Sequence, residues 1–355
     1  MADDFQYHID HHGSLVRPAE LVAARAGGDA KARLAAEDEA AVATAHEQRR
    51  LTVSAISDGQ FRRDYFESVV HDHVDGFGAA AGGNPLADLA GIAPARRRSV
   101  AGALAAKGRL AGHEVAPILG TVDRPVFVQL PSPGHLALLS DPASAAVAGE
   151  RLAAILGAEI NALAAQGVAY VALANPLLVP LLTVGGRARL RDLSLDPDAL
   201  LDAAIAADRA ALGGLDAPAH FRVGLDLTDH GPLPTTEGGW DGAALGKLLD
   251  GTPFHRLGVD FPAAAERRLP FDDIRPGLAV SFGVVDVADP EPEDVGKLLA
   301  ITDGIADRRD LDDVAFAPNA GFAVTADAAF LTGEQQRAKL RLVETICRYY
   351  WGNEI

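Results

Sequence analysis

The chain has 355 residues, of which 48% are hydrophobic, so it is long enough for one large buried core or two ordinary ones. Its 49 acidic and 32 basic residues give a formal net charge of −17, which disfavours binding to nucleic acid and to anionic membranes. No apolar run reaches about 20 residues and the first residues lack a signal-peptide pattern, so we expect no membrane span and a cytoplasmic location. The single Cys347 excludes an internal disulfide and a multi-cysteine metal site.

The first third of the chain predicts two strands that each end in polar residues. The first is a short run that turns at Gly13, and the second covers 52–56. Between them, range 21–51 is rich in alanine and charge and predicts one or two amphipathic helices. Range 75–122 is rich in glycine, and its apolar and polar residues alternate only weakly. This pattern predicts an excursion from the main fold that carries a hairpin.

The rest of the chain alternates apolar runs with helical segments. The predicted strands cover 126–130, 168–173, 222–227, 257–261, 278–285 and 314–317. Two Asp-Pro pairs start helices over 141–167 and 196–213, and Thr332 with Gln335 forms a capping box for a last helix. Eight strands alternating with helices predict parallel pairing. We therefore expect a single (β/α)8 TIM barrel over 1–355, with 75–122 as an insertion after the second strand.

The ends of the strands carry the candidates for chemistry, because a barrel gathers them at one mouth. Asp226 and Asp260 follow neighbouring strands, and two carboxylates held close together would separate their pKa values into an acid and a base. The alternative is that each caps a helix or pairs with an arginine. His11, His12 and His230 also follow strand ends, where an imidazole suits acid–base work or simply forms part of the wall.

Several of these segments resemble one known family. Ranges 8–18, 37–39, 58–63, 318–323 and 339–352 are similar to the cobalamin-independent methionine synthases. The likeness is to the short, single-barrel members that correspond to the catalytic half of the long enzyme. The resemblance implies a barrel in which zinc activates the thiol of homocysteine, and in which 5-methyltetrahydrofolate donates a methyl group to that thiol.

The chain departs from that family at the zinc site. The four corresponding positions hold Asp226, Thr228, Asp260 and Ala320 where the family has histidine, cysteine, glutamate and cysteine. A shift of the fifth-strand match would bring in His220 and Arg222 instead. Neither alignment supplies a cysteine, and a set of oxygen ligands prefers a hard ion to zinc. We therefore expect no zinc-thiolate centre and assign no metal ligand. The motif His71-Asp72-His73 could chelate a metal but lacks a third ligand.

The substrate-holding positions differ too. Gln60 and Asn175 stand where the resemblance places carboxylates that hold the amino group of the substrate. Neutral amides remove the charge partner of an ammonium, so homocysteine should be a poor ligand. Arg62 has two readings, an anion-binding residue or a salt-bridge residue. The predicted substrate-binding residues are His11, Ser14, Arg17, Asp58, Gln60, Arg62, Asn175, Asp286 and Asn319.

Three functions fit these patterns. The first is a methyltransferase-like enzyme that keeps a folate- or thiol-type substrate without zinc; the folate methyl donor is implied by the resemblance alone. The second is a metal-independent lyase or decarboxylase on the same barrel, as in the related uroporphyrinogen decarboxylases. The third is a small-molecule-binding protein without turnover. Catalysis would fall to Asp226, Asp260 and His230, and the loop 229–241 would act as a lid. The sequence leaves a homo-oligomer open.

Overall fold

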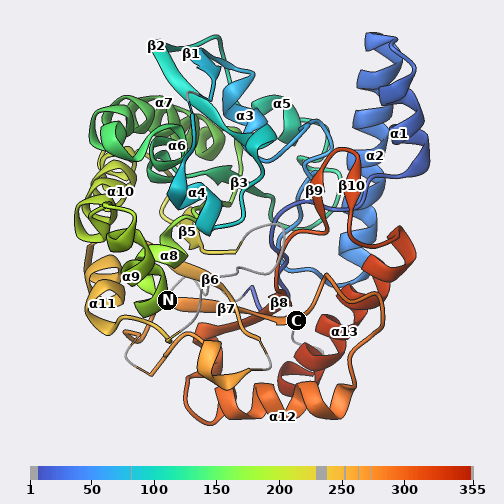
Figure 1. Cartoon of the computed structure of the whole chain (residues 1–355). Coiled ribbons are helices and arrows are strands. Elements are labelled where there is room, and N and C mark those ends of the chain that lie inside the picture. Colours follow the sequence, from blue (N-terminus) through green and yellow to red (C-terminus); the bar gives the residue numbers. More distant parts are fainter. Residues whose placement is uncertain are drawn as a thin grey trace.

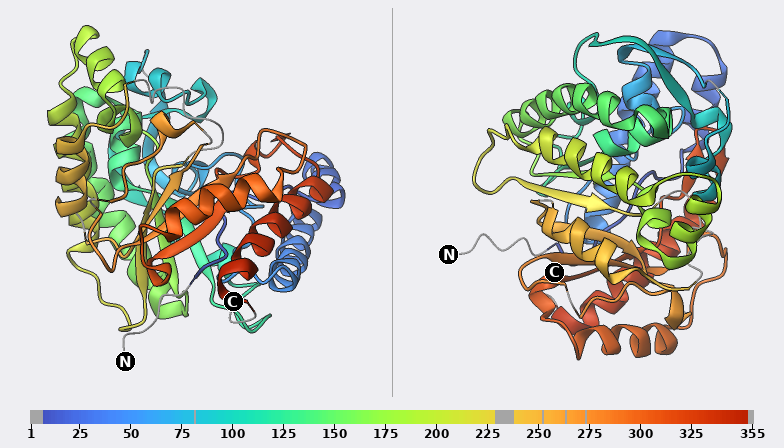
Figure 2. Two further views of the ribbon diagram at one scale, coloured as in Figure 1. Left: turned by 90° about the horizontal axis from the view of Figure 1, so that it is seen from below. Right: turned by 60° about the vertical axis from the view of Figure 1, so that its left-hand side comes forward.

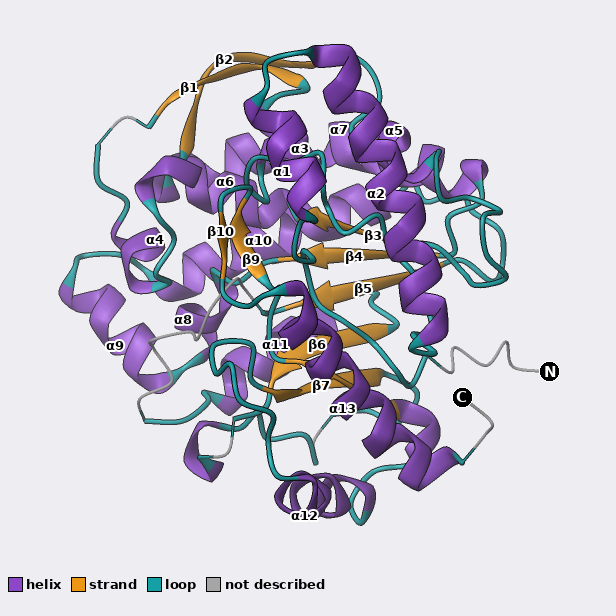
Figure 3. Ribbon diagram, turned by 90° about the vertical axis from the view of Figure 1, so that its right-hand side faces the viewer, coloured by secondary structure: helices purple, strands orange, loops and turns teal. Residues whose placement is uncertain are grey.

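The computed structural model describes residues 7–80, 82–228, 238–251, 253–262, 264–272 and 274–352. At its centre lies a parallel sheet of six strands in the order β3-β4-β5-β6-β7-β8 (Figures 1 and 3). The strands are β3 (Phe127–Pro131), β4 (Tyr170–Ala174), β5 (Arg222–Asp226), β6 (Arg256–Asp260), β7 (Ala279–Val285) and β8 (Val314–Pro318). All six lie at the predicted apolar runs, and their parallel pairing confirms an α/β fold.

Two short segments continue this sheet at its edges. Ile9 forms a parallel bridge to β8, and Ile56 forms one to the residue that precedes β3. The backbone N–H of Ser54 donates to the carbonyl of Ile9 at 2.9 Å, which joins the two segments to each other. The strand predicted over 52–56 is thus reduced to one bridge. Its first residue, Thr52, has a left-handed φ of 53°, which a regular strand cannot contain.

Helices surround the sheet in Figures 1 and 2. The longer ones are α1 (Ala19–Ala26), α2 (Ala30–Arg50), α6 (Pro133–Ser140), α7 (Ala145–Gln166), α9 (Val184–Asp192), α10 (Pro197–Leu212), α11 (Gly242–Gly251), α12 (Val295–Ala306) and α13 (Gly333–Trp351). The short ones are α3 (Ser68–His71), α4 (Pro85–Leu89), α5 (Gly112–Val115) and α8 (Leu178–Leu182). Two predicted caps are present: Asp196 accepts N–H groups at the start of α10, and Thr332 with Gln335 forms the capping box of α13. At the third, Asp141 caps the 3-10 turn Pro142–Ser144 that precedes α7 rather than α7 itself. None of the described helices is both long and apolar enough to cross a membrane.

A two-stranded antiparallel ribbon stands at the top of Figure 1, formed by β1 (Val74–Ala79) and β2 (Arg98–Ala106). Gly76 of β1 has a φ of 99°, and a Cβ atom there would lie 2.4 Å from the carbonyl oxygen of Ala103. Range 112–115, within the predicted excursion, forms the helix α5. A second, shorter ribbon pairs β9 (Ala323–Thr325) with β10 (Ala328–Ala329) directly after β8.

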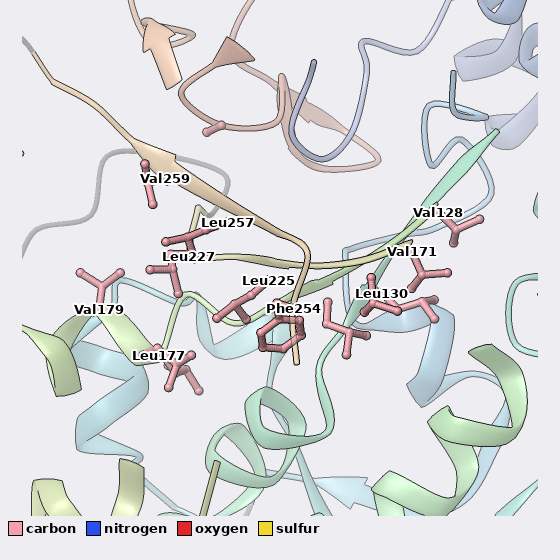
Figure 4. Close-up of a cluster of buried hydrophobic side chains, with 14 of the residues drawn as sticks. Val128, Leu130, Val171, Leu177, Val179, Leu225, Leu227, Phe254, Leu257 and Val259 are labelled. Atoms are coloured by element: carbon pink, nitrogen blue, oxygen red, sulfur yellow. The ribbon is translucent and has the colours of Figure 1, made fainter. Parts of the chain in front are cut away.

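The central strands present two chemically different faces. The face toward the surrounding helices is aliphatic, and Figure 4 shows part of this buried cluster, including Val128, Val171 and Leu257. The alternate residues of the same strands face the other way and include polar side chains. Gln129, Asp226, Arg256 and Ser281 are buried on this inner face. Burying polar groups costs free energy unless they are hydrogen-bonded, so this face is where a site is expected.

Candidate functional site

A chain of buried hydrogen bonds crosses the inner face of the sheet. Gln129 of β3 donates from Nε2 to Oδ2 of Asp226, the last residue of β5, at 2.6 Å. Gln60 donates from its own Nε2 to Oε1 of Gln129 at 2.9 Å. The other oxygen of Asp226, Oδ1, accepts the backbone N–H of Thr228 at 2.8 Å. Asp226 is therefore held by donors on both of its oxygens.

His12 lies beside Asp226, with its Nδ1 3.9 Å from Oδ1 of the carboxylate. Its Nε2 is 3.0 Å from the hydroxyl oxygen of Ser281 on β7. Gly258 of β6 lies opposite Asp226 in the sheet, and a Cβ atom there would be 3.0 Å from Oδ1 and 3.3 Å from the ring of His12. The absence of a side chain at position 258 thus leaves room for the imidazole. The gap that remains between these groups has a volume of about 10 Å³, which suits about one water molecule.

The turn that carries Gln60 has unusual backbone geometry. Gly59 has a φ of 76° and Gln60 a φ of 59°, a left-handed conformation that is uncommon outside glycine. The backbone N–H of Gln60 donates to Oδ1 of Asp58 at 3.0 Å, and its carbonyl accepts from Arg17 at 2.9 Å. Burial raises the pKa of Asp58 from 3.8 to about 7, and the nearby Glu114 adds to the shift. The turn therefore holds a titratable carboxyl in the neutral range.

The described residues also form a cavity of about 420 Å³ beside α12, at the carboxyl ends of β6, β7 and β8. Three predicted site residues line it: Asp260, Asp286 and Asn319. Burial raises the pKa of Asp260 from 3.8 to about 6; Arg267 opposes the shift and Asp286 adds to it. Oδ1 of Asp260 is buried and has no hydrogen-bond partner among the described residues. This carboxyl can therefore exchange a proton near neutral pH.

Asp226 and Asp260 have separate surroundings. Asp226 belongs to the interior gap with His12, whereas Asp260 lines the cavity beside α12. The groups that shift the pKa of Asp260 do not include Asp226, although His12 of that gap acts on both sides and lowers the pKa of Asp260. The two residues meet the requirement of neighbouring strand ends, but their carboxyl groups serve different parts of the site.

The other predicted binding residues have mixed surroundings. Ser14 donates its hydroxyl to the carbonyl of Ala323 at 2.7 Å, and Nε2 of His11 lies 3.0 Å from Oε1 of Gln48. Arg17 donates to the backbone carbonyls of residues 60 and 63, so it holds the turn. Arg62 pairs with Glu37 and Asp38 of α2, which favours its salt-bridge interpretation.

Asn175, directly after β4, differs from these residues. Its side chain is fully buried, with 0% exposure, and neither its Oδ1 nor its Nδ2 has a hydrogen-bond partner among the described residues. His230 and residues 229–237 of the predicted lid lie outside the described residues. Trp240, at the far end of that loop, donates from Nε1 to the carbonyl of Arg267 at 3.2 Å.

The residues at the expected zinc positions do not fit a zinc-thiolate centre. Both oxygens of Asp226 already accept hydrogen bonds, from Gln129 and Thr228, and the side chain of Ala320 has no atom that could bind a metal. Within the described ranges, no three His, Cys, Asp or Glu side chains gather as a metal centre requires. At the second motif, Nδ1 of His71 lies 3.2 Å from the hydroxyl of Tyr65, and burial lowers the pKa of His71 to about 4.

Two polar residues of the inner face, Gln129 and Ser281, were not predicted from the sequence as site residues. Both lie inside apolar strand runs, at Val-Gln-Leu in β3 and Val-Ser-Phe in β7. A single polar residue inside a buried strand must find a partner, so this pattern is a signal that could have indicated them.

Comparisons with known proteins place the fold. No family model matches the chain. The Bacillus subtilis protein described as uncharacterized protein YxjH is 25% identical over 374 residues, covering 97% of this chain and 95% of its own. A B12-independent methionine synthase from Shewanella sp. W3-18-1, solved with selenomethionine, superposes with a TM-score of 0.75 at 15% identity over 97% of both chains. A structure assigned as a vitamin-B12-independent methionine synthase from Listeria monocytogenes gives 0.72 at 19% identity over 98% of both.

The chain has the methionine synthase fold. The resemblance noted in the sequence therefore extends over nearly its whole length.

Proposed function

We propose that this protein is a methionine-synthase-like methyltransferase that acts on a small substrate at the carboxyl ends of the strands, without a zinc-thiolate centre. The single observation that carries this is Asp260, a half-buried carboxyl with a pKa of about 6 and a buried, unpartnered Oδ1, lining a cavity of about 420 Å³. A cavity of this size suits a small metabolite. The likeness in fold supports the reaction class but does not name the acceptor.

We also propose that the sheet closes into the (β/α)8 barrel of a single domain, with 75–122 as its insertion. Three contacts support closure. Ile9 bridges to β8, Ile56 bridges to the residue before β3, and Ser54 hydrogen-bonds to Ile9. These contacts connect the two edges of the six-stranded sheet through two further parallel segments.

In the proposed reaction, Asp260 acts as a general base. Its carboxylate takes the proton of an acceptor group X–H, and the lone pair of X forms a bond to the methyl carbon of the donor. The carbon–nitrogen bond of a folate donor then breaks, its electron pair stays on nitrogen, and that nitrogen takes a proton from solvent. Asn319 and Asp286, which line the same cavity, would hold the substrate.

The same carboxyl gives the lyase alternative a specific basis. A protonated Asp260 could donate its proton to a carbanion left by loss of carbon dioxide, because its pKa of about 6 keeps part of the population protonated near neutrality. Methyl transfer and decarboxylation leave different products, so one assay separates them.

The test is incubation of the purified protein with 5-methyltetrahydrofolate and a panel of thiol, amine and hydroxyl acceptors, with tetrahydrofolate as the measured product. We expect turnover by wild type that is lost in Asp260→Asn and kept in Asp123→Asn, a matched change at an exposed carboxylate before β3. Carbon dioxide release from a panel of small carboxylic acids without tetrahydrofolate would favour the lyase. Equal turnover by wild type and Asp260→Asn would refute the role of Asp260.

A further inference from the structure

The last long helix, α13, carries two buried polar side chains in its first two turns. Gln336 accepts the backbone N–H of Val16 on its Oε1 at 2.6 Å, and Lys339, three residues later, is 0% exposed. Residues three apart lie on the same face of a helix. Gln336 reaches the turn that follows Ile9, and Lys339 reaches the loop after β7. These two loops lie on either side of β8, because Ile9 and β7 are its neighbours in the sheet.

The ammonium of Lys339 is bound by the loop after β7. Its Nζ donates to the backbone carbonyl of Glu291 at 2.6 Å and to Oε2 of Glu293 at 2.9 Å. A buried ammonium costs free energy unless it is paired and hydrogen-bonded, and these two contacts supply both. Lys339 therefore ties α13 to this loop in a way that an apolar side chain of similar length could not.

Glu293 extends this contact to the cavity beside α12. Its Oε2 accepts from Lys339, and its Oε1 accepts the backbone N–H of Asp286 at 2.6 Å. Oδ1 of Asp286 accepts a hydrogen bond from Nδ2 of Asn319 at 3.4 Å, and Oδ1 of Asn319 accepts one from the N–H of Val287 at 3.0 Å. A carboxylate can serve two donors on two oxygens, whereas an amide has only one oxygen. Glu293 thus links Lys339 to the wall of the cavity.

We propose that Lys339 is a positioning residue, which acts through Glu293 to hold the loop after β7 as one wall of the substrate cavity. This rests on the proposed function only in taking that cavity as the substrate site. Burial raises the pKa of Asp260 in the cavity, and Asp286 adds to the shift. Lys339 and Glu293 are not among the groups that act on this pKa, so their effect on Asp260 must come through the position of the loop.

The test is the pKa of Asp260 in Lys339→Met, measured on the full chain by NMR of its carboxyl resonances from pH 3 to pH 8, with Asp260→Asn to assign the signal. Loss of a cation by itself would raise this pKa. A loop that is no longer held would instead move Asp286 away and admit water to Asp260. We therefore expect the pKa to fall from about 6 by about one pH unit.

Glu293→Gln should lower the pKa of Asp260 by a similar amount, because its single amide oxygen cannot serve both donors. The double variant Lys339→Met/Glu293→Gln should lower it no further than either single one, since both changes break the same link. Should Lys339→Met fail to fold, Glu293→Gln provides the same measurement with the same outcomes.

Gln336→Leu is the matched control, because it removes a buried polar contact from the same face of α13 but from the other loop. Both Gln336→Leu and Lys339→Met should lower the melting temperature, whereas only Lys339→Met should change the pKa of Asp260. An unchanged or raised pKa of Asp260 in Lys339→Met, or an equal fall in Gln336→Leu, would overturn the inference. None of these readouts depends on methyl transfer, so failure here is distinct from failure of the proposed reaction.

Discussion

The pKa of Asp260 makes a quantitative prediction for Asp260→Asn. The pKa is raised from 3.8 to about 6, so the folded state binds this proton more tightly than the unfolded chain does. The free energy of unfolding is therefore not lowered by this group below pH 4, and it falls as the pH rises from about 4 to about 6. A difference of about two pKa units corresponds to roughly 3 kcal/mol. Wild type should therefore carry this cost above pH 6, whereas an asparagine, which does not ionise, should not.

We expect Asp260→Asn to melt at nearly the same temperature as wild type at pH 4 and at a higher temperature at pH 8. With an unfolding entropy of roughly 2 cal/mol/K per residue, 3 kcal/mol corresponds to a rise of about 4 °C for this chain. The assay is thermal unfolding of both proteins from pH 4 to pH 8, with Asp123→Asn as the exposed control. Turnover should be lost in the same variant that gains stability. If the two melting temperatures differed by the same amount at every pH in this range, Asp260 would not have a raised pKa in the folded protein.

Three further predictions concern the packing of the fold and the binding of zinc. Arg96→Met should cost about 3 to 5 kcal/mol in denaturant unfolding, because it removes the arginine that contacts the fully buried Glu67 at 2.7 Å and leaves this carboxylate, among the described residues, with only Nε2 of His135, at 2.9 Å. A loss under 1 kcal/mol would contradict this. Gly283→Ala should lower both the melting temperature and turnover, because the new Cβ would lie 2.5 Å from Cα of Asn319 in the backbone after β8. An unchanged melting temperature would show that β7 and the segment after β8 are not packed this closely. Protein incubated with zinc and then gel-filtered should hold well under one equivalent by elemental analysis, since the ligand positions lack sulfur; stoichiometric zinc that is lost in Asp260→Ala would mean that oxygen ligands have rebuilt a site.

The sequence by itself determined the elements whose signals are local. Six strands appear at their apolar runs, and the caps of α10 and α13 form at Asp196 and Thr332 as predicted, because a cap needs only a side chain and the next turn of the same helix. The ends of parallel strands share one edge of a sheet, so the sequence could also place Asp260 and Asn319 in one region.

Only the tertiary structure decided how these residues are used. Arg62 pairs with α2 and Asp226 with Gln129, partners that lie 24 or more residues away along the chain. Burial that raises the pKa of Asp58 and Asp260, and the left-handed turn at Gln60, likewise depend on packing between distant segments. The local sequence pattern predicts which residues lie at the end of a strand. Their hydrogen bonds and their desolvation depend on neighbours in space, and these neighbours determine which side chain is available to bind a ligand.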